Sequence, residues 1–110
     1  MELVYKNEKL KRLCEDANYN KVLIKSFGVE VAKKLPRRIM ELKAFECLND
    51  VPVCLPFRRH KLTGNFKGNF AINITDQFRL IFRPQNNNIV IEDLRHIKYI
   101  EIMEVSKHYE

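Results

Sequence analysis

The segment from Asn69 to Arg83 constrains the fold more than any other part of the chain, because apolar and polar residues alternate along it on both sides of a short polar stretch. If residues 75–77, Thr75, Asp76 and Gln77, form a turn, each apolar residue before it faces an apolar residue after it. The facing pairs are Ile74 with Phe78, Ile72 with Leu80, and Phe70 with Phe82. The pattern therefore predicts a β-hairpin with one wholly apolar face.

The opposite face of this hairpin is predicted to be mainly polar and basic. The same register sets Asn73 opposite Arg79 and Asn69 opposite Arg83, with Ala71 and Ile81 between these pairs. We expect the apolar face to pack on the rest of the protein, which leaves the other face available to a ligand.

Helical patterns fill the first half of the chain, after a short strand predicted at residues 2–5. Asn7 is placed to cap a first helix, and Gly28 is a plausible break before a second one. The apolar positions of the first helix recur with a spacing of i, i+3, i+4 and i+7, at Leu10, Leu13, Cys14 and Ala17. Those of the second are Val31, Leu35, Ile39 and Leu42, continuing to Phe45.

Pro36 complicates the second helix. A proline inside a helix removes a backbone hydrogen bond and clashes one turn back, so the helix either kinks there or begins its regular part near Pro36 as a first-turn residue. The sequence does not decide between these two alternatives.

The second half of the chain, beyond a join near Asn49 to Pro56, is predicted to consist of strands. The last of these runs from Tyr99 to Val105, and Gln85 to Asn88 form a polar loop before it. With 110 residues the chain is the size of a single domain, residues 1–110. The fold class is therefore α+β, with N-terminal helices packed on one face of a small, mainly antiparallel sheet.

Positive charge is concentrated in the strand half. The chain has 20 Lys and Arg against 14 Asp and Glu, a net charge of +6. Between Asp50 and Glu92 the only acidic residue is Asp76, whereas the basic residues there are Arg58, Arg59, Lys61, Lys67, Arg79 and Arg83, with His60 among them. Such a field favours a polyanion, and basic side chains beside a sheet neutralise phosphates without reading sequence. A single-stranded RNA could also stack on Phe57, Phe66 or Tyr109, although Phe57 and Phe66 are more often core residues.

The three cysteines, Cys14, Cys47 and Cys54, include no CxxC pair and fit neither a disulfide framework nor a zinc site. The N-terminus lacks the apolar core of a signal peptide, and no stretch approaches the roughly 18 apolar residues that a membrane span needs. We therefore expect a cytoplasmic protein with no membrane association.

Two motifs in the strand half resemble a known family. Residues 59–72, RHKLTGNFKGNFAI, are followed by DQFRLIF at residues 76–82. This order of His, Leu and Gly, then Lys-Gly and an aromatic, then an Asp-Gln-aromatic-Arg hairpin is similar to the HigB branch of the RelE/ParE toxin superfamily. The ending from Ile100 to Tyr109 looks like the last strand and His/Tyr tail of that family, so the resemblance covers most of the chain.

The resemblance implies a RelE-like fold and the activity of a toxin from a type II toxin–antitoxin system. Toxins of this kind bind the small ribosomal subunit and cut mRNA in the decoding site, with neither a metal nor a cofactor. A ribose 2′-hydroxyl attacks the adjacent phosphate and leaves a 2′,3′-cyclic phosphate, which inhibits translation. The implied partners are a HigA-like helix-turn-helix antitoxin, the ribosome with its mRNA and, through the antitoxin only, operator DNA.

The resemblance also assigns roles to particular residues. His60 and His108 are the acid and base candidates, because imidazole exchanges protons near neutral pH. Lys61, Lys67 and Arg79 would hold the scissile and flanking phosphates, and Arg79 can do so with two parallel hydrogen bonds. Tyr109 would stack on a base or orient the phosphate. The further RNA-binding candidates are Arg58, Arg59, Asn73 and Arg83.

The tail departs from the family pattern. HigB-type chains commonly end in Asp-Tyr-His, whereas this chain ends in Ser106-Lys107-His108-Tyr109-Glu110. Because neighbouring strand residues point to opposite faces, the exchanged order could place Tyr109 where the family has its histidine. Two alternatives therefore stay open, a ParE-like gyrase inhibitor and a non-catalytic RNA- or protein-binding module with the same fold.

Overall fold

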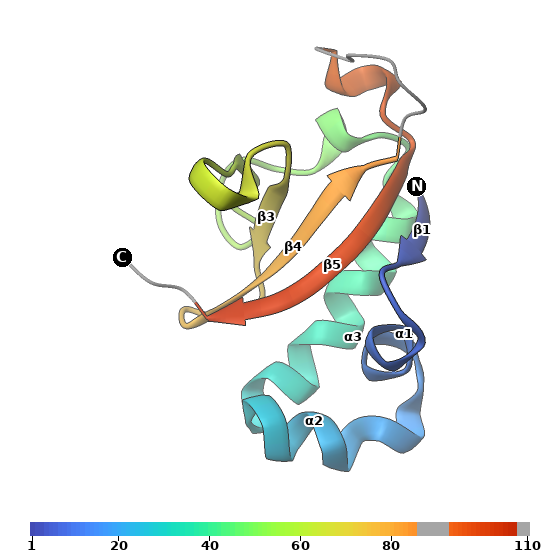
Figure 1. Ribbon diagram of the computed structural model, residues 1–110, viewed down its shortest axis with the longest axis vertical. Coiled ribbons are helices and arrows are strands. Elements are labelled where there is room, and N and C mark those ends of the chain that lie inside the picture. The colour runs from blue at the N-terminus through green and yellow to red at the C-terminus, as the bar shows by residue number, and fades with distance from the viewer. Residues whose placement is uncertain (86–92, 108–110) are drawn as a thin grey trace.

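The computed structural model describes residues 1–85 and 93–107, and within them the chain forms one five-stranded sheet with helices against it (Figure 1). The strands lie in the order β1-β5-β4-β3-β2. Their bounds are β1 Glu2–Tyr5, β2 His60–Lys61, β3 Phe70–Asn73, β4 Phe78–Pro84 and β5 Tyr99–Lys107. The α-helices are α1 Glu8–Glu15, α2 Asn20–Phe27 and α3 Val29–Ala44, and the short 3₁₀ helices are η1 Ala17–Tyr19, η2 Leu48–Asp50, η3 Gly64–Phe66 and η4 Leu94–His96.

The hairpin of β3 and β4 has the register that the alternating pattern predicts. The two strands pair Phe70 with Phe82, Ala71 with Ile81, Ile72 with Leu80 and Asn73 with Arg79. The Thr75 hydroxyl closes the turn by accepting hydrogen bonds from the backbone N–H groups of Gln77 and Phe78, at 3.2 and 3.1 Å. The predicted pair of Asn69 with Arg83 is wrong, because the ladder starts at Phe70 and the Asn69 side chain instead donates to the Phe66 carbonyl oxygen.

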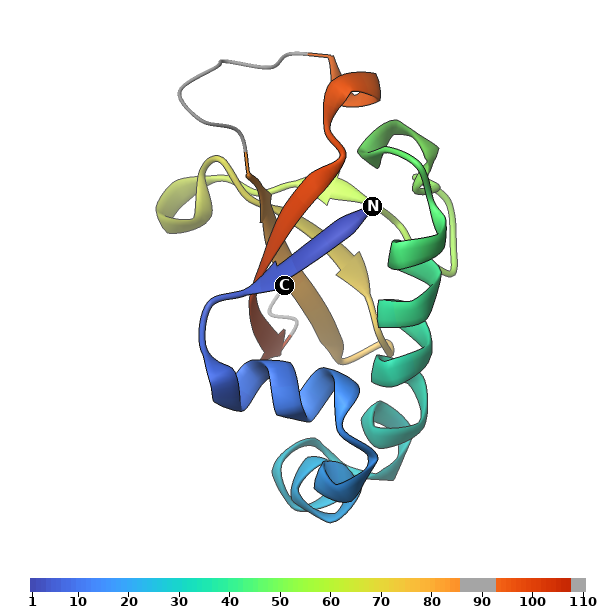
Figure 2. The same cartoon turned by 90° about the vertical axis from the view of Figure 1, so that its right-hand side faces the viewer.

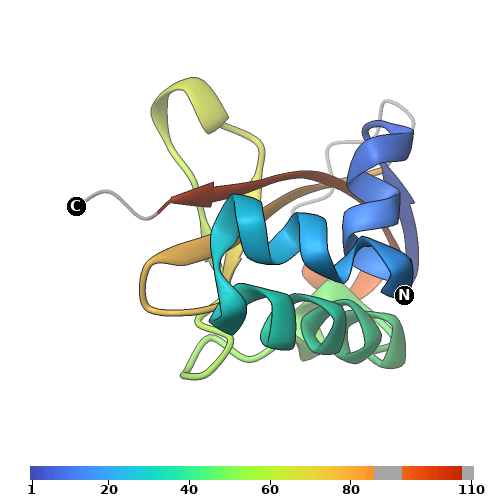
Figure 3. The same ribbon diagram turned by 90° about the horizontal axis from the view of Figure 1, so that it is seen from below.

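Three helices cover the apolar face of the sheet and share one hydrophobic core with it, which confirms the predicted fold class. Figures 2 and 3 show α3 running along one side of the strands, with α2 on the same side. Leu35, Leu42, Leu80 and Phe82 are all 0% exposed in this core. Each such side chain contributes about 1.5–3 kcal/mol by leaving water, so this face supplies much of the folding free energy.

The first helical segment differs from the prediction at its end. Asn7 caps α1 as expected by accepting a hydrogen bond from the backbone N–H of Leu10 at 2.9 Å. The helix stops at Glu15, however, because the Asp16 carboxylate accepts from the Asn18 N–H and so competes with the helical backbone. The placement of Ala17 on the apolar stripe is therefore wrong, since it lies exposed in η1, and α2 follows as a separate helix.

Pro36 lies inside α3 and does not start it. The helix begins directly after Gly28, whose φ of +96° lies in a region that favours glycine and which separates α2 from α3 as expected. The helix continues through Pro36 to Ala44, although Pro36 has no N–H to donate to the Ala32 carbonyl oxygen. Leu35 and Ile39, on either side of Pro36, are buried in the core, and this packing compensates for the lost hydrogen bond.

Strand β5 lies between β1 and β4 in the sheet. It pairs in parallel with β1 and antiparallel with β4, and it extends two residues beyond the predicted end at Val105. Its pairing with β4 contains a β-bulge, because Ile81 faces Glu104 whereas Phe82 faces Ile102. Residues 51–59 form no strand, and the predicted loop at Gln85 to Asn88 lies, apart from Gln85, outside the described residues.

Candidate functional site

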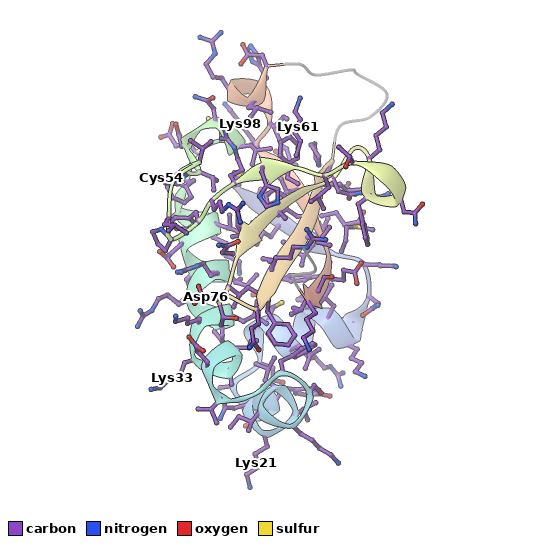
Figure 4. All side chains as sticks on the ribbon, turned by 90° about the vertical axis from the view of Figure 1, so that its left-hand side faces the viewer. Lys21, Lys33, Cys54, Lys61, Asp76 and Lys98 are labelled. Atoms are coloured by element: carbon purple, nitrogen blue, oxygen red, sulfur yellow. The ribbon has the colours of Figure 1, made fainter. Side chains whose placement is uncertain are left out.

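The side of the sheet that faces away from the helices carries a polar surface, which we call the open face. Figure 4 looks toward it, with β3 and β4 in front. One row of paired residues crosses four strands, and the next row crosses three. The first is His60, Ala71, Ile81 and Glu104, and the second is Asn73, Arg79 and Ser106. Ala71 and Ile81 are 0% exposed although they do not belong to the helix-side core. Neighbouring side chains therefore cover them, and we call these two residues the floor of the open face.

His60 is held in one orientation by its own loop. Its Nδ1 lies 2.8 Å from the carbonyl oxygen of Arg58. Because a carbonyl oxygen only accepts hydrogen bonds, Nδ1 must carry the proton, and in the neutral ring Nε2 keeps its lone pair. Nε2 makes no hydrogen bond to any described residue. His60 can therefore accept a proton from a ligand on the open face, or donate one when its ring is charged.

Arg58, whose carbonyl oxygen contacts His60, has an unusual backbone conformation. Its φ of +50° lies in the left-handed region, where a non-glycine residue is strained by about 1–3 kcal/mol. The Arg58 N–H donates to the Cys54 carbonyl oxygen at 2.8 Å, and the Asn73 N–H donates to the Phe57 carbonyl oxygen at 2.7 Å. The first bond closes a turn within the loop, the second ties the loop to β3, and the Arg58 carbonyl oxygen lies 2.8 Å from His60 Nδ1. The Arg58 side chain itself is exposed.

Arg79 lies on β4 between Asn73 and Ser106. Its guanidinium makes no ion pair with another described residue, and its Nε is shielded from solvent without a hydrogen-bond partner. A half-buried guanidinium whose charge is not neutralised by a described carboxylate is suited to binding a phosphate. His60 and Arg79 thus face the same side of the sheet.

The carboxylates on β5 were not anticipated from the sequence. Strict alternation from Glu101 puts Glu104 on the helix side, next to the buried Ile102. The bulge at Met103 adds one residue, and both Glu101 and Glu104 then lie on the open face. Glu101 accepts from Arg83 at 2.6–2.7 Å and from Gln85 at 3.3 Å, so Arg83 is ion-paired.

The structure does not bring all predicted site residues together. Because Lys61 pairs with Phe70, it lies on the opposite side of the sheet from His60. Lys61 and Lys67 line a pocket of about 740 Å³ at the end of the sheet, which we call the edge pocket. The side chain of Arg59 turns inward and donates to the Leu48 carbonyl oxygen at 2.6 Å, and burial lowers its pKa.

The remaining candidates divide into core and undescribed residues. Phe57 is buried, with its ring edge-to-face against Phe45 at 5.5 Å and the Arg38 guanidinium 5.1 Å from its centre, so it belongs to the core. Phe66 is half-buried in η3. His108 and Tyr109 lie outside the described residues. Among the described residues no helix is long and apolar enough to cross a membrane.

A protein-family model described as the RelE-like toxin of type II toxin–antitoxin system HigB matches residues 3–96. No curated protein sequence matches the chain significantly.

Several solved structures share the fold at low sequence identity. A YoeB/ParE toxin from Agrobacterium tumefaciens is 15% identical with a TM-score of 0.54, and the match covers 99% of this chain and 100% of the other. A point mutant of YafQ from E. coli is 15% identical with a TM-score of 0.57, covering 96% and 91%. The YoeB–YefM complex from Staphylococcus aureus is 14% identical with a TM-score of 0.55, covering 99% and 98%.

Proposed function

The chain belongs to the HigB-like family of RelE-like toxins from type II toxin–antitoxin systems, and we propose that it is a ribosome-dependent mRNA endonuclease that inhibits translation. The observation that carries this proposal is the open face, where His60 Nε2 and an Arg79 guanidinium without an ion pair to any described residue lie on one side of the sheet. Cleavage of RNA needs a group that moves protons and a cation that stabilises the phosphorane, and these two residues supply them.

In the proposed reaction, the ribose 2′-oxygen attacks the adjacent phosphorus while the bond from phosphorus to the 5′-oxygen breaks. The 2′-hydroxyl gives its proton to a base, an acid protonates the leaving 5′-oxygen, and the product is a 2′,3′-cyclic phosphate. His60 and His108 share the acid and base roles. Arg79 contacts the nonbridging phosphate oxygens, whose charge grows in the transition state, and Tyr109 orients the phosphate or stacks on a base.

The other basic and polar residues bind the RNA on either side. Asn73 lies opposite Arg79 on the open face, Arg58 is an exposed residue of the loop before His60, and Lys61 and Lys67 contact a flanking phosphate. Arg59 and Arg83 add positive charge, although the first is hydrogen-bonded to the Leu48 carbonyl oxygen and the second is ion-paired with Glu101. Such contacts hold the RNA backbone without reading its sequence, so the choice of the cleavage site requires a further positioning of the mRNA.

The small ribosomal subunit would provide that positioning, in the cytoplasm where translation takes place. The chain is also proposed to bind an antitoxin of the HigA-like helix-turn-helix type, and through it operator DNA. A solved structure with the same fold is a complex of the toxin YoeB with YefM. The Arg79 guanidinium, which forms no ion pair with a described residue, would suit a carboxylate of such an antitoxin as well as a phosphate of RNA.

The test is induced expression without an antitoxin, followed by primer extension on a reporter mRNA in a reconstituted translation system. We expect growth arrest and cleaved mRNA only when ribosomes are present. His60→Ala and Arg79→Ala should each abolish cleavage, whereas Lys33→Ala on α3 should not. Supercoiling defects with intact mRNA would replace this proposal by gyrase inhibition, and translation arrest without cleavage would indicate a non-catalytic binding module.

A further inference from the structure

The edge pocket lies where β2 forms the border of the sheet. Its walls come from the loop between β2 and β3, the end of β4 and the 3₁₀ helix η4, and it measures about 740 Å³, within the range of small-molecule sites. The apolar walls are Leu62, Phe70, Pro84, Leu94 and Ile97. Lys61 and Lys67 stand among them as the charged residues.

The charges around the edge pocket favour an anion. Lys61 and Lys67 are exposed, and neither forms an ion pair with any residue in the described ranges. Asp93, next to the wall residue Leu94, is already bound by the Arg95 guanidinium at 2.7 Å, which holds the Asp93 pKa at about 2. As far as the described part of the chain goes, both lysines are thus available to a phosphate.

The polar wall of the edge pocket contains an unsatisfied acceptor. The Asn69 amide donates to the Phe66 carbonyl oxygen at 3.0 Å, which fixes its orientation and directs its Oδ1 elsewhere. That oxygen is shielded from solvent and accepts no hydrogen bond from the described residues. Buried polar atoms normally have partners, and a shift of the Asn69 side chain toward the edge pocket would let this oxygen accept a hydrogen bond from a ligand N–H group.

We propose that the edge pocket binds a single RNA nucleotide, with the base against the apolar walls and its phosphate between Lys61 and Lys67. The inference rests on the proposed function for its biological meaning, because His60 and Lys61 are consecutive residues whose side chains lie on opposite sides of an edge strand. An RNA strand that crosses this edge reaches both. The edge pocket then holds the nucleotide next to the one that is cleaved.

The test titrates the isolated full chain with adenosine 5′-monophosphate and follows backbone amide signals by NMR, with no ribosome present. We expect shifts at Leu62, Gly64 and Gly68, weaker shifts with adenosine, and shifts at the lysines alone with inorganic phosphate. A Lys61→Gln, Lys67→Gln double variant should weaken binding about tenfold or more, because two charge-assisted contacts are lost. The matched Lys33→Gln control, at the other end of the molecule from Lys61 (Figure 4), should not.

Thr63→Phe provides a second variant that keeps both lysines, since Thr63 is an exposed wall residue and a larger side chain there obstructs the edge pocket. It should also weaken binding. The proposal is overturned if inorganic phosphate reproduces the whole effect of the nucleotide, if the signals that move belong only to the open face, or if the double variant binds normally. Nucleotide binding without ribosome-dependent cleavage would support the edge-pocket proposal and contradict the proposed nuclease activity. Ribosome-dependent cleavage without nucleotide binding would support the nuclease activity and contradict the edge-pocket proposal.

Discussion

The helix-side face and the open face of the hairpin are built from the same two strands but differ in burial and in chemistry. Leu80 and Phe82 point into the helix-side core and are 0% exposed, whereas Arg79 and Arg83, their neighbours in sequence, point the other way. Because side chains alternate along a strand, a shift of one residue would exchange the two sets. The difference teaches that the helix-side face carries most of the folding free energy, whereas the charged residues of the open face can change at little cost in stability.

The largest expected effect is a loss of mRNA cleavage when a residue of the open face is replaced. His60→Gln should lower the rate of mRNA cleavage by roughly 100- to 10,000-fold, because proton transfer contributes about that much to catalysis. The melting temperature should hardly change, since a half-exposed side chain away from the core affects stability by about 0.5 kcal/mol or less. Primer extension and thermal unfolding measure the two quantities on the same preparation.

Lys33→Gln is the control for this experiment, as an exposed side chain on α3. If His60→Gln cleaved mRNA at the normal rate while remaining folded, the open face would not be the catalytic face.

The next effect concerns the helix-side face. Leu80→Ala should lower the free energy of unfolding by about 2–5 kcal/mol, because it leaves a cavity in a fully buried position. Urea denaturation followed by circular dichroism measures it. Arg79→Gln, one residue away on the open face, is the matched comparison and should cost well under half as much. Equal losses at both positions would show that the two faces do not divide stability and function.

A smaller effect tests the floor of the open face. Ile81→Val should lower the free energy of unfolding by about 0.5–1.5 kcal/mol, because Ile81 is 0% exposed even though it lies outside the helix-side core. Ile24→Val on α2 removes the same methylene where the side chain is 37% exposed, and should cost less. Indistinguishable values from chemical denaturation would mean that the open face has no packed floor.

The smallest effect belongs to the ion pair between Arg83 and Glu101. A double-mutant cycle with Arg83→Gln and Glu101→Gln should give a coupling energy of about 0–1 kcal/mol that falls with added salt, because the Arg83 side chain is 51% exposed. Melting curves at low and high salt give this value. A coupling well above 2 kcal/mol would show that the open face also stabilises the fold.

Local sequence patterns predicted several elements correctly. The strand at residues 2–5, the Asn7 cap, the break at Gly28 and the register of β3 with β4 are all as expected. Each depends on neighbouring residues and on rules of short range, which are capping, glycine conformation and strand alternation. The first helix was extended too far because the same apolar spacing continues past Asp16, where the local hydrogen bond of its side chain ends the helix.

Less of the candidate site was predictable. His60 and Arg79 were identified through the family motif, and the structure places both on the open face. Lys61 was grouped with them, although alternation along the chain already indicates that a residue next to His60 in a strand points away from it. The bulge that brings Glu104 onto the open face left no signal in the sequence, because it depends on how β5 pairs with β4.

By itself the sequence determined the two-sided hairpin, the helical half and the concentration of basic residues, because alternation, helical spacing and charge are properties of neighbouring residues. Only the tertiary structure decided that Lys61 and Lys67 line the edge pocket, that Arg59 turns inward and that Arg83 meets Glu101. These outcomes depend on which side of a strand a residue takes and on what a distant segment places opposite it.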